Sequence, residues 1–282
     1  MSHSQATDTL GEWRESAPYW GRHAQTIRVM FAPLTVALIE EAGIRPGQRV
    51  LDVAGGPGEP SLTIAEVVQA SGSVTCTDAV AEMVQAAESE ARSRGLTNIE
   101  FRRCAADSLP FDSDSFDAVV SRLGVMFFPD PLIGLREMLR VTKPGGALSL
   151  AVWHRSDLNP FSYVVTKAIS RYVETPPAAP GASDAFRFAQ PGALADLLRE
   201  AGATEVRERV LQFHIEAPIS PEEFWAFRSE TSGTLRAKLA RLSAQERVMV
   251  AQEVQETARE FFTNNQMSFP AQALIVTGEK PF

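Results

Sequence analysis

Val50-Leu51-Asp52-Val53-Ala54-Gly55-Gly56-Pro57-Gly58 is the stretch of sequence that decides the fold. It joins an apolar, strand-like run to a turn with three glycines, and a helical pattern follows from Ser61. Glycines let the backbone turn sharply and let a ligand approach without a Cβ in the way. In open α/β sheets, ligands bind beyond the carboxyl ends of the strands. Taken alone, the turn would suit a dinucleotide, a nucleoside or no ligand at all.

The sequence on both sides of this turn alternates between two kinds of pattern. Short apolar β-branched runs and helical patterns take turns over residues 45–150, which predicts βαβ units and a parallel sheet. The expected strands are Arg49–Val53, Ser73–Thr77, Ile99–Arg103, Phe116–Ser121 and Ala147–Trp153. The expected helices between them are Ser61–Ala70, Asp78–Arg94 and Pro131–Val141, the last ending before Lys143-Pro144-Gly145-Gly146.

The second half of the chain is more helical. Helices are expected over Pro160–Val173 and Gly192–Ala201, with a loop at Thr175–Gly181 between them. Capping boxes begin two further helices at Ser220 and Ser243. The remaining expected strands are Glu205–Ile215 and Ala271–Thr277. This pattern predicts an N-terminal helical arm over residues 1–44 and one domain over residues 45–282, with a helical insertion at about 218–266.

Composition excludes several classes of protein. The 282 residues carry a formal net charge of -8, which disfavours binding to a nucleic-acid backbone. The polar start lacks the basic and apolar regions of a signal peptide, and no apolar run approaches the roughly 18 residues of a membrane span, so we expect a cytoplasmic protein. Cys76 and Cys104 are expected to be buried, reduced thiols, and no ligand spacing for a metal is evident.

Two acidic residues narrow the choice of ligand. Asp52 lies where an anion would repel a pyrophosphate but would suit an ammonium or sulfonium group. The dinucleotide spacing places its third glycine at Ser61, where it is missing. Asp78 ends the second strand, where a carboxylate accepts hydrogen bonds from ribose hydroxyls, although Asp is also a common helix N-cap.

The loop after the third strand supplies a further acidic group. Asp107 would accept a hydrogen bond from the exocyclic amine of adenine, and the backbone N–H near Ala106 would donate to a ring nitrogen. Without the other motifs, this segment would be interpreted as a solvated acidic loop.

The order of these motifs resembles the class I S-adenosylmethionine-dependent methyltransferases, and in particular the group that contains the ubiquinone/menaquinone C-methyltransferases. The matching segments lie between residues 45 and 153, with weaker similarity at Phe186–Gly202 and Ala273–Lys280. They are Val50–Gly58, Thr77-Asp78, Ala105–Asp107, Leu109–Phe111, Phe116-Asp117 and Leu139–Gly146.

The resemblance implies a Rossmann-like, mostly parallel, seven-stranded sheet with helices on both faces and an antiparallel last strand. It also implies that S-adenosyl-L-methionine is the cofactor, with its methionine part near Asp52 and Gly55–Gly58, and with Ser121 and Arg122 on the methionyl side. One departure is Ala54, where the broader class often has glycine. The full set of candidate cofactor contacts is Asp52, Ala54, Gly55, Gly56, Pro57, Gly58, Asp78, Ala79, Met83, Ala105, Ala106, Asp107, Ser121 and Arg122.

The acceptor side is less well defined by the sequence. Trp13, Tyr19, Trp20 and Phe31 crowd the N-terminal arm, where they would pack on the core, line the pocket, or do both. The arm and the insertion are expected to form a lid that excludes water.

The candidate bases are two histidines. His154 follows the fifth strand, and His23 lies in the aromatic arm. The alternative interpretation is that each of these histidines is a polar or structural residue and not a base. Arg122 or Arg155 would instead hold an acidic or phenolate substrate.

Three functions compete. The preferred one is transfer of a methyl group to O, C or N of a small-molecule acceptor by a monomer or homodimer, with no nucleic acid bound. The second is a non-catalytic protein that binds S-adenosylmethionine or acts as a scaffold. The third is a nicotinamide-dependent oxidoreductase, which Asp52 and Ser61 disfavour. Protein methylation stays open.

Overall fold

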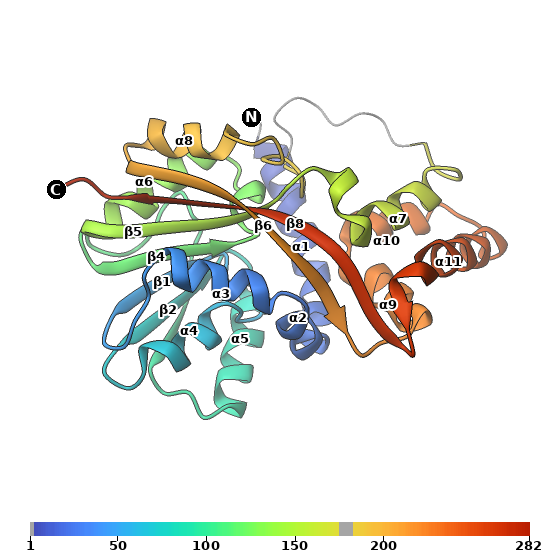
Figure 1. The fold of residues 1–282 in the computed structure, drawn as a ribbon, viewed down its shortest axis with the longest axis horizontal. Coiled ribbons are helices and arrows are strands. Elements are labelled where there is room, and N and C mark those ends of the chain that lie inside the picture. The colour runs from blue at the N-terminus through green and yellow to red at the C-terminus, as the bar shows by residue number, and fades with distance from the viewer. Residues whose placement is uncertain (1–2, 175–182) are drawn as a thin grey trace.

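The computed structural model describes residues 3–174 and 183–282, with side chains described from residue 9 onward. The loop expected at Thr175–Gly181 lies outside the described residues. One open sheet has the strand order β3-β2-β1-β4-β5-β8-β6 (Figure 1). Strands β1 to β5 run parallel, and β8 is antiparallel to both of its neighbours, β5 and β6. The expected mostly parallel α/β sheet is confirmed, and a two-residue β7 paired with β8 adds an eighth strand.

The strand bounds agree closely with the expected ones in the first half of the chain. They are β1 Arg49–Val53, β2 Ser73–Asp78, β3 Ile99–Arg103, β4 Phe116–Arg122, β5 Thr142–Trp153, β6 Thr204–Ala217, β7 Phe262–Thr263 and β8 Gln266–Glu279. The helices are α1 His3–Arg22, α2 Ala24–Met30, α3 Ala32–Glu41, α4 Ser61–Val68, α5 Ala81–Ser93, α6 Pro131–Val141, α7 Pro160–Ile169, α8 Ala193–Ala201, α9 Pro221–Thr231, α10 Gly233–Leu239 and α11 Ala244–Ala258.

Some boundaries differ from the expectation, for reasons that lie outside the local sequence. Strand β5 begins at Thr142 because Gly145 and Gly146 exchange backbone hydrogen bonds with Lys280, at the far end of the chain. Helix α5 begins at Ala81 rather than Asp78, because Asp78 still pairs within the sheet as the last residue of β2. Helix α7 ends at Ile169, four residues earlier than expected.

Strands β6 and β8 are 14 residues each, longer than expected because they pair with each other from Thr204↔Glu279 to Ala217↔Met267. This pairing is non-local, so the sequence pattern of neither strand reveals its full length.

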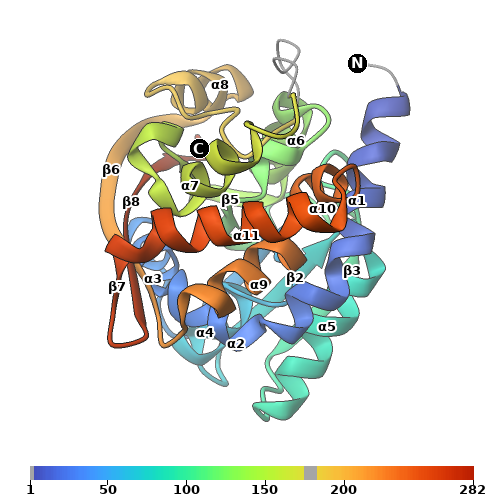
Figure 2. The ribbon, with the colours of Figure 1, turned by 90° about the vertical axis from the view of Figure 1, so that its right-hand side faces the viewer.

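The helices divide between the faces and one end of the sheet. Helices α6 and α8 cover one face, while α3, α4 and α5 cover the other (Figure 1). Helices α1, α9 and α11 lie in front of the end at which the strands β1, β2 and β4 finish (Figure 2). This end is where ligands bind in open α/β sheets.

Candidate functional site

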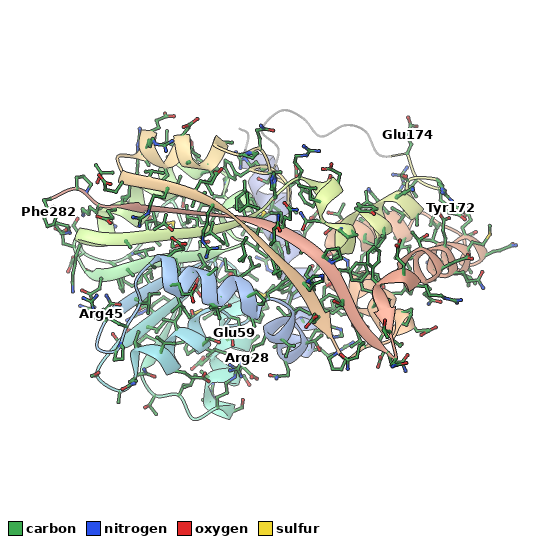
Figure 3. The ribbon with its side chains drawn as sticks, viewed as in Figure 1. Arg28, Arg45, Glu59, Tyr172, Glu174 and Phe282 are labelled. Carbon is green, nitrogen blue, oxygen red and sulfur yellow. The ribbon has the colours of Figure 1, made fainter. Side chains whose placement is uncertain are left out.

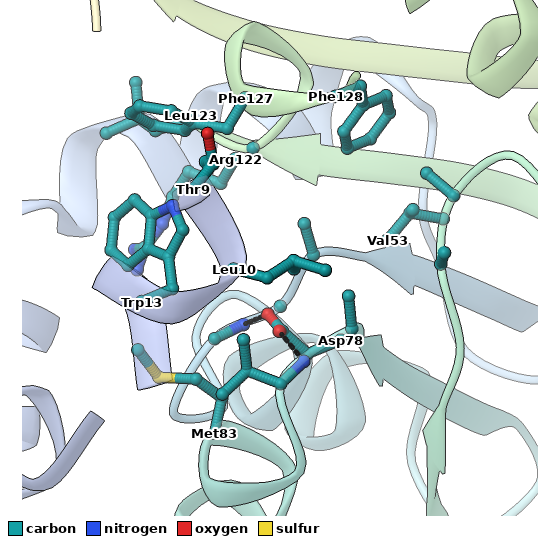
Figure 4. Close-up of a pocket in the computed structure, with 18 of the residues that line it drawn as sticks. Thr9, Leu10, Trp13, Val53, Asp78, Met83, Arg122, Leu123, Phe127 and Phe128 are labelled. Carbon is teal, nitrogen blue, oxygen red and sulfur yellow. Dashed lines mark hydrogen bonds between the residues drawn. The ribbon is translucent and has the colours of Figure 1, made fainter. Parts of the chain in front are cut away.

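A pocket lies between the carboxyl ends of β1, β2 and β4 and the N-terminal helices (Figure 4). Its lining combines the Gly-rich turn, the residues that follow β2 and β3, and aromatic side chains from α1 and from the segment after β4. Three of the four arm aromatics, Trp13, Trp20 and Phe31, line it. These side chains therefore pack against the protein and form a pocket wall at the same time.

Asp78 is the best-oriented carboxylate in the pocket. Its Oδ2 accepts from the backbone N–H of Gly56 at 3.0 Å, and its Oδ1 accepts from Val80 N–H at 2.9 Å (Figure 4). The N-cap position of α5 is Val80, so Asp78 is not the cap of that helix. Burial raises the pKa of the Asp78 carboxyl, and the hydrogen bonds from the backbone oppose that shift. The two backbone donors fix the direction in which this carboxylate faces the pocket.

The Gly-rich turn gives the pocket a floor of backbone. Gly55, Gly56 and Pro57 line it, together with Ala54, which adopts a left-handed φ of 60°. Gly56 has a φ of 55°, and a Cβ built there would meet open space. Gly58 does not line the pocket, and its Cβ would lie 2.7 Å from Leu62. Gly58 therefore allows close packing of α4, while the earlier turn residues face the ligand space.

Asp52 lies beneath the turn rather than in the pocket. It is fully buried, and its Oδ2 accepts from both the Ser61 hydroxyl at 2.6 Å and the Ser61 backbone N–H at 3.2 Å. Among the described residues no group donates to its Oδ1. Burial raises the pKa of Asp52 to about 7, against the lowering effect of Ser61. In this position the Asp52 carboxylate is not exposed to a ligand in the pocket.

The remaining candidate cofactor contacts fall into two groups. Ala79, Met83, Ala105, Ala106 and Asp107 line the side of the pocket next to Asp78. Ser121 does not line the pocket; its hydroxyl is buried and has no hydrogen-bond partner among the described residues. Its neighbour Arg122 does line it.

Arg122 joins the pocket to the N-terminal helices. Its Nη1 donates to the Thr35 hydroxyl at 2.8 Å, and its guanidinium lies 5.8 Å from the centre of the Phe31 ring. Burial lowers the pKa of Arg122, while the charges of Glu59 and Asp52 oppose the shift. The pocket therefore contains a cation beside several carboxylates.

Neither candidate base lines the pocket. His154 is buried, and its Nδ1 accepts from Arg155 N–H at 2.8 Å and lies 3.1 Å from the Ala189 carbonyl. His23 lies 2.8 Å from Glu230, and its ring packs edge-on against Phe227. Local contacts hold both histidines outside the pocket wall, and a role for either of them as the base stays a prediction.

Two parts of the pocket lining were not predicted from the sequence. Glu59 faces the pocket while its carboxylate pairs with Arg94 at 2.8 Å and Arg28 at 3.4 Å, which joins the turn to α2 (Figure 3). The segment Leu123–Asp130, which includes Phe127 and Phe128, also lines the pocket except at Val125 and Met126. Its place directly after β4, at the carboxyl end of the sheet, was the signal that would have revealed it.

The two cysteines differ from expectation in one respect. Cys76 is buried as expected, whereas Cys104 is half-buried and lines the pocket. Burial raises the pKa of the Cys104 thiol to about 11, so it is protonated at neutral pH and unsuited to act as a nucleophile. Within residues 3–174 and 183–282 no cluster of His, Cys, Asp or Glu is arranged to hold a metal ion. None of the helices in this described part combines the length and apolar character needed to span a membrane.

Known proteins resemble this chain in both sequence and structure. The model of the ubiE/COQ5 methyltransferase family matches residues 35–173. A relative, the ubiquinone/menaquinone biosynthesis C-methyltransferase UbiE of Cellvibrio japonicus, is 36% identical over 135 residues, which are 48% of this chain and 53% of the relative. The chain spans about half the length of the curated relatives it matches.

Two solved structures share the fold. A methyltransferase from Bacillus halodurans, described as putative, has a TM-score of 0.57 and 19% identity, covering 88% of this chain and 99% of that one. Phosphoethanolamine N-methyltransferase 2 of Haemonchus contortus, in complex with S-adenosylhomocysteine, has a TM-score of 0.57 and 15% identity, covering 96% and 59%. The resemblance seen in the sequence is thus confirmed: residues 35–173 match the ubiE/COQ5 methyltransferase family, and the fold is that of the S-adenosylmethionine-dependent methyltransferases.

Proposed function

We propose that the protein transfers a methyl group from S-adenosyl-L-methionine to O, C or N of a small-molecule acceptor. The observation that carries this proposal is the oriented Asp78 carboxylate at the end of β2, facing a pocket floored by the Gly-rich turn. A carboxylate fixed by two backbone donors keeps free lone pairs for both hydroxyls of a ribose. The matched family supports the same ligand.

The residues present fit this cofactor at each of its parts. Asp78 would hold the ribose, Ala106 and Asp107 would frame the adenine, and Gly55–Pro57 would lie along the methionine part, with Arg122 on its far side. The open space at Gly56 leaves room for close approach of a ligand to the backbone. The acidic groups near the turn suit a sulfonium cation better than a pyrophosphate.

A second feature argues against a dinucleotide. A pyrophosphate would bind at the N-terminus of α4, where free backbone N–H groups and the helix dipole attract anions. Here the Ser61 N–H and hydroxyl are already bonded to Asp52, a carboxylate. That contact leaves a buried acid where the phosphates of a nicotinamide cofactor would need donors.

The cofactor, when bound, supplies the methyl group and its own leaving group. The protein would then position the two reactants and exclude water, and such positioning contributes up to roughly 7–11 kcal/mol in favourable cases. Leu10, Trp13 and Trp20 supply the cover on the arm side. We expect deletion of residues 2–20 to abolish turnover, measured with an identified acceptor; unchanged turnover would contradict the role of the arm.

Calorimetric titration with S-adenosylmethionine, S-adenosylhomocysteine and NADH tests the proposal. We expect both adenosyl ligands to bind and NADH not to bind. Asp78→Ala should weaken adenosyl binding at least about 100-fold, because it removes two hydrogen bonds to a charged group. Asp196→Ala, an exposed carboxylate on α8, is the matched control and should change nothing. Absence of adenosyl binding, or binding of NADH in its place, would overturn the proposal.

A further inference from the structure

Arg122, the last residue of β4, is a cation in the pocket wall without a bonded anion. Among the residues that the structure describes, no other lysine, arginine or histidine lines the pocket. Arg122 makes no ion pair with a described carboxylate, and its one hydrogen bond runs from Nη1 to the uncharged Thr35 hydroxyl. Its guanidinium also lies over the Phe31 ring, which attracts a cation but offers no hydrogen-bond acceptor.

One edge of the Arg122 guanidinium is available to a ligand. Its Nε and Nη2 donate to no described residue, yet neither belongs to the buried polar atoms that lack a partner, so both reach accessible space. These two nitrogens form the fork with which an arginine binds a carboxylate through parallel hydrogen bonds. Arg140 uses the same fork in this protein, donating to the Glu137 carboxylate from Nε at 2.7 Å and from Nη2 at 2.8 Å. Arg122 therefore has the donors for a carboxylate and lacks the carboxylate.

The acids nearest to this fork are already engaged. Glu59 and Asp52 are the two carboxylates whose charges act on Arg122. The Glu59 carboxylate pairs with two other arginines, and the Asp52 carboxylate accepts from Ser61 beneath the turn. Neither acid forms a hydrogen bond with Arg122. The partner of the fork must therefore come from a ligand in the pocket.

The sheet sets the separation between Arg122 and Asp78, the carboxylate proposed to hold the ribose. Strand β1 lies between β2 and β4, so the Gly-rich turn after β1 separates Asp78, at the end of β2, from Arg122, at the end of β4 (Figure 4). Neighbouring strands lie about 4.8 Å apart, which puts these two strand ends about 10 Å apart. The methionine chain of the cofactor, extended from the ribose across the turn, spans a similar distance. Its terminal carboxylate would therefore reach Arg122.

We propose that Arg122 binds the α-carboxylate of the cofactor's methionine part, and that the methyl acceptor carries no anionic group. The inference rests on the proposed function and narrows its class of acceptor. With Arg122 engaged by the cofactor, no second cation in the described lining is left for the acceptor. The arm and the segment after β4 offer it apolar side chains, among them Leu10, Trp20, Leu123 and Phe127. An anion transferred there from water would lack a counter-charge, which is costly.

Two adenosyl ligands that differ only in the carboxylate test the first part of the inference. The protein is titrated with S-adenosylhomocysteine and with its decarboxylated analogue, 5′-deoxy-5′-(3-aminopropylthio)adenosine. We expect S-adenosylhomocysteine to bind about tenfold or more tightly than the analogue. Arg122→Met should reduce that preference to less than about twofold and should not weaken binding of the analogue, which has no carboxylate for the guanidinium. Arg199→Met, which changes an exposed arginine paired with Asp196 on α8, is the matched control and should keep the full preference.

A second titration separates the cofactor from the acceptor as the source of the carboxylate. The protein, saturated with S-adenosylhomocysteine, is titrated with benzoate and 2-naphthoate, each beside its primary amide of similar shape. We expect neither carboxylate to bind more than about twofold more tightly than its amide, because Arg122 is already occupied. A larger preference for carboxylates that disappears in Arg122→Met would show that Arg122 serves an acidic acceptor, and it would overturn the inference.

A second variant keeps the test decisive if Arg122→Met fails to fold. Arg122→Lys retains the charge but loses the two parallel donors, so it should lower the preference for S-adenosylhomocysteine over the analogue by about threefold or more. The inference is also overturned if wild type shows no preference between the two adenosyl ligands, or if the preference survives unchanged in the Arg122 variants. Failure of both adenosyl ligands to bind would instead overturn the proposed function.

Discussion

The two halves of the pocket are built in different ways. On one side, the turn after β1 and the carboxylate at the end of β2 are held by backbone hydrogen bonds within the parallel sheet. On the other, aromatic side chains from α1, from Phe31 between α2 and α3, and from the segment after β4 meet through ring contacts, such as that of Trp13 with Phe127 at 5.0 Å. The first half uses short stretches of sequence, and the second requires elements far apart in the chain to assemble. The first half therefore suits a cofactor that many enzymes share, and the second half suits an acceptor that is specific to one enzyme.

The largest expected effect concerns the buried acid under the turn. Because the pKa of Asp52 rises from 3.8 to about 7, the folded protein binds this proton more tightly than the unfolded chain does. Its contribution to stability is therefore fully present below about pH 4 and is lost as the pH rises through 7, a change of about 4 kcal/mol. Asp52→Asn keeps an acceptor for Ser61 and should remove this pH dependence.

Urea unfolding of both proteins between pH 4 and pH 8 measures the difference. If the free energy of unfolding changes with pH in the same way for wild type and Asp52→Asn, the Asp52 carboxyl is not held in its neutral form. That result would remove one difference between the buried turn and the aromatic wall.

The next effect concerns Glu59, which joins the two halves. Its side chain is only 6% exposed and pairs with Arg94 and Arg28. Glu59→Gln should cost about 3 kcal/mol of stability, near the lower end for breaking a buried ion pair because Arg28 is one-third exposed. Arg28→Met should cost less, about 1 kcal/mol. We expect hydrogen exchange in residues 24–30 to accelerate in both variants; unaltered exchange there would mean that Glu59 does not tie the arm to the turn.

The smallest effects come from a matched pair of glycine substitutions, one in each half. A Cβ at Gly55 would lie 2.7 Å from both Asp52 Oδ2 and Cys76 Sγ, so Gly55→Ala should destabilise the protein by about 1–3 kcal/mol. A Cβ at Gly11, inside α1, meets nothing within 4 Å, so Gly11→Ala should stabilise it by about 0.5–1 kcal/mol. Thermal unfolding of the two variants should shift in opposite directions, and shifts of the same sign would refute the difference in packing.

The sequence predicted the first half of the pocket well, because its signals are local. Strands β1 and β3 have the expected bounds, and Asp78 and the turn lie where the motif order places them. The second half was only partly predicted. The aromatic residues of the arm were recognised, but nothing in the sequence around Glu59 shows that Arg28 and Arg94 lie beside it.

The histidines illustrate the same limit. His154 follows β5 at the correct end of the sheet, yet its Nδ1 accepts from the Arg155 N–H and its ring lies outside the pocket. Position along a strand predicts which end of the sheet a residue occupies. It does not predict which neighbour binds its side chain.

The pairing of β6 with β8 has a consequence for how this protein would diversify. Ala217 and Met267 are partners across adjacent strands, so the segment that carries α9, α10 and α11 leaves and re-enters the sheet at neighbouring points. In topological terms that segment is the loop of a β-hairpin, and doubling the length of such a loop costs only about 0.6 kcal/mol in closure entropy. Residues 218–261 would thus be exchangeable as a cassette, while the pairing register of β6 and β8 and the residues that line the pocket stay as they are.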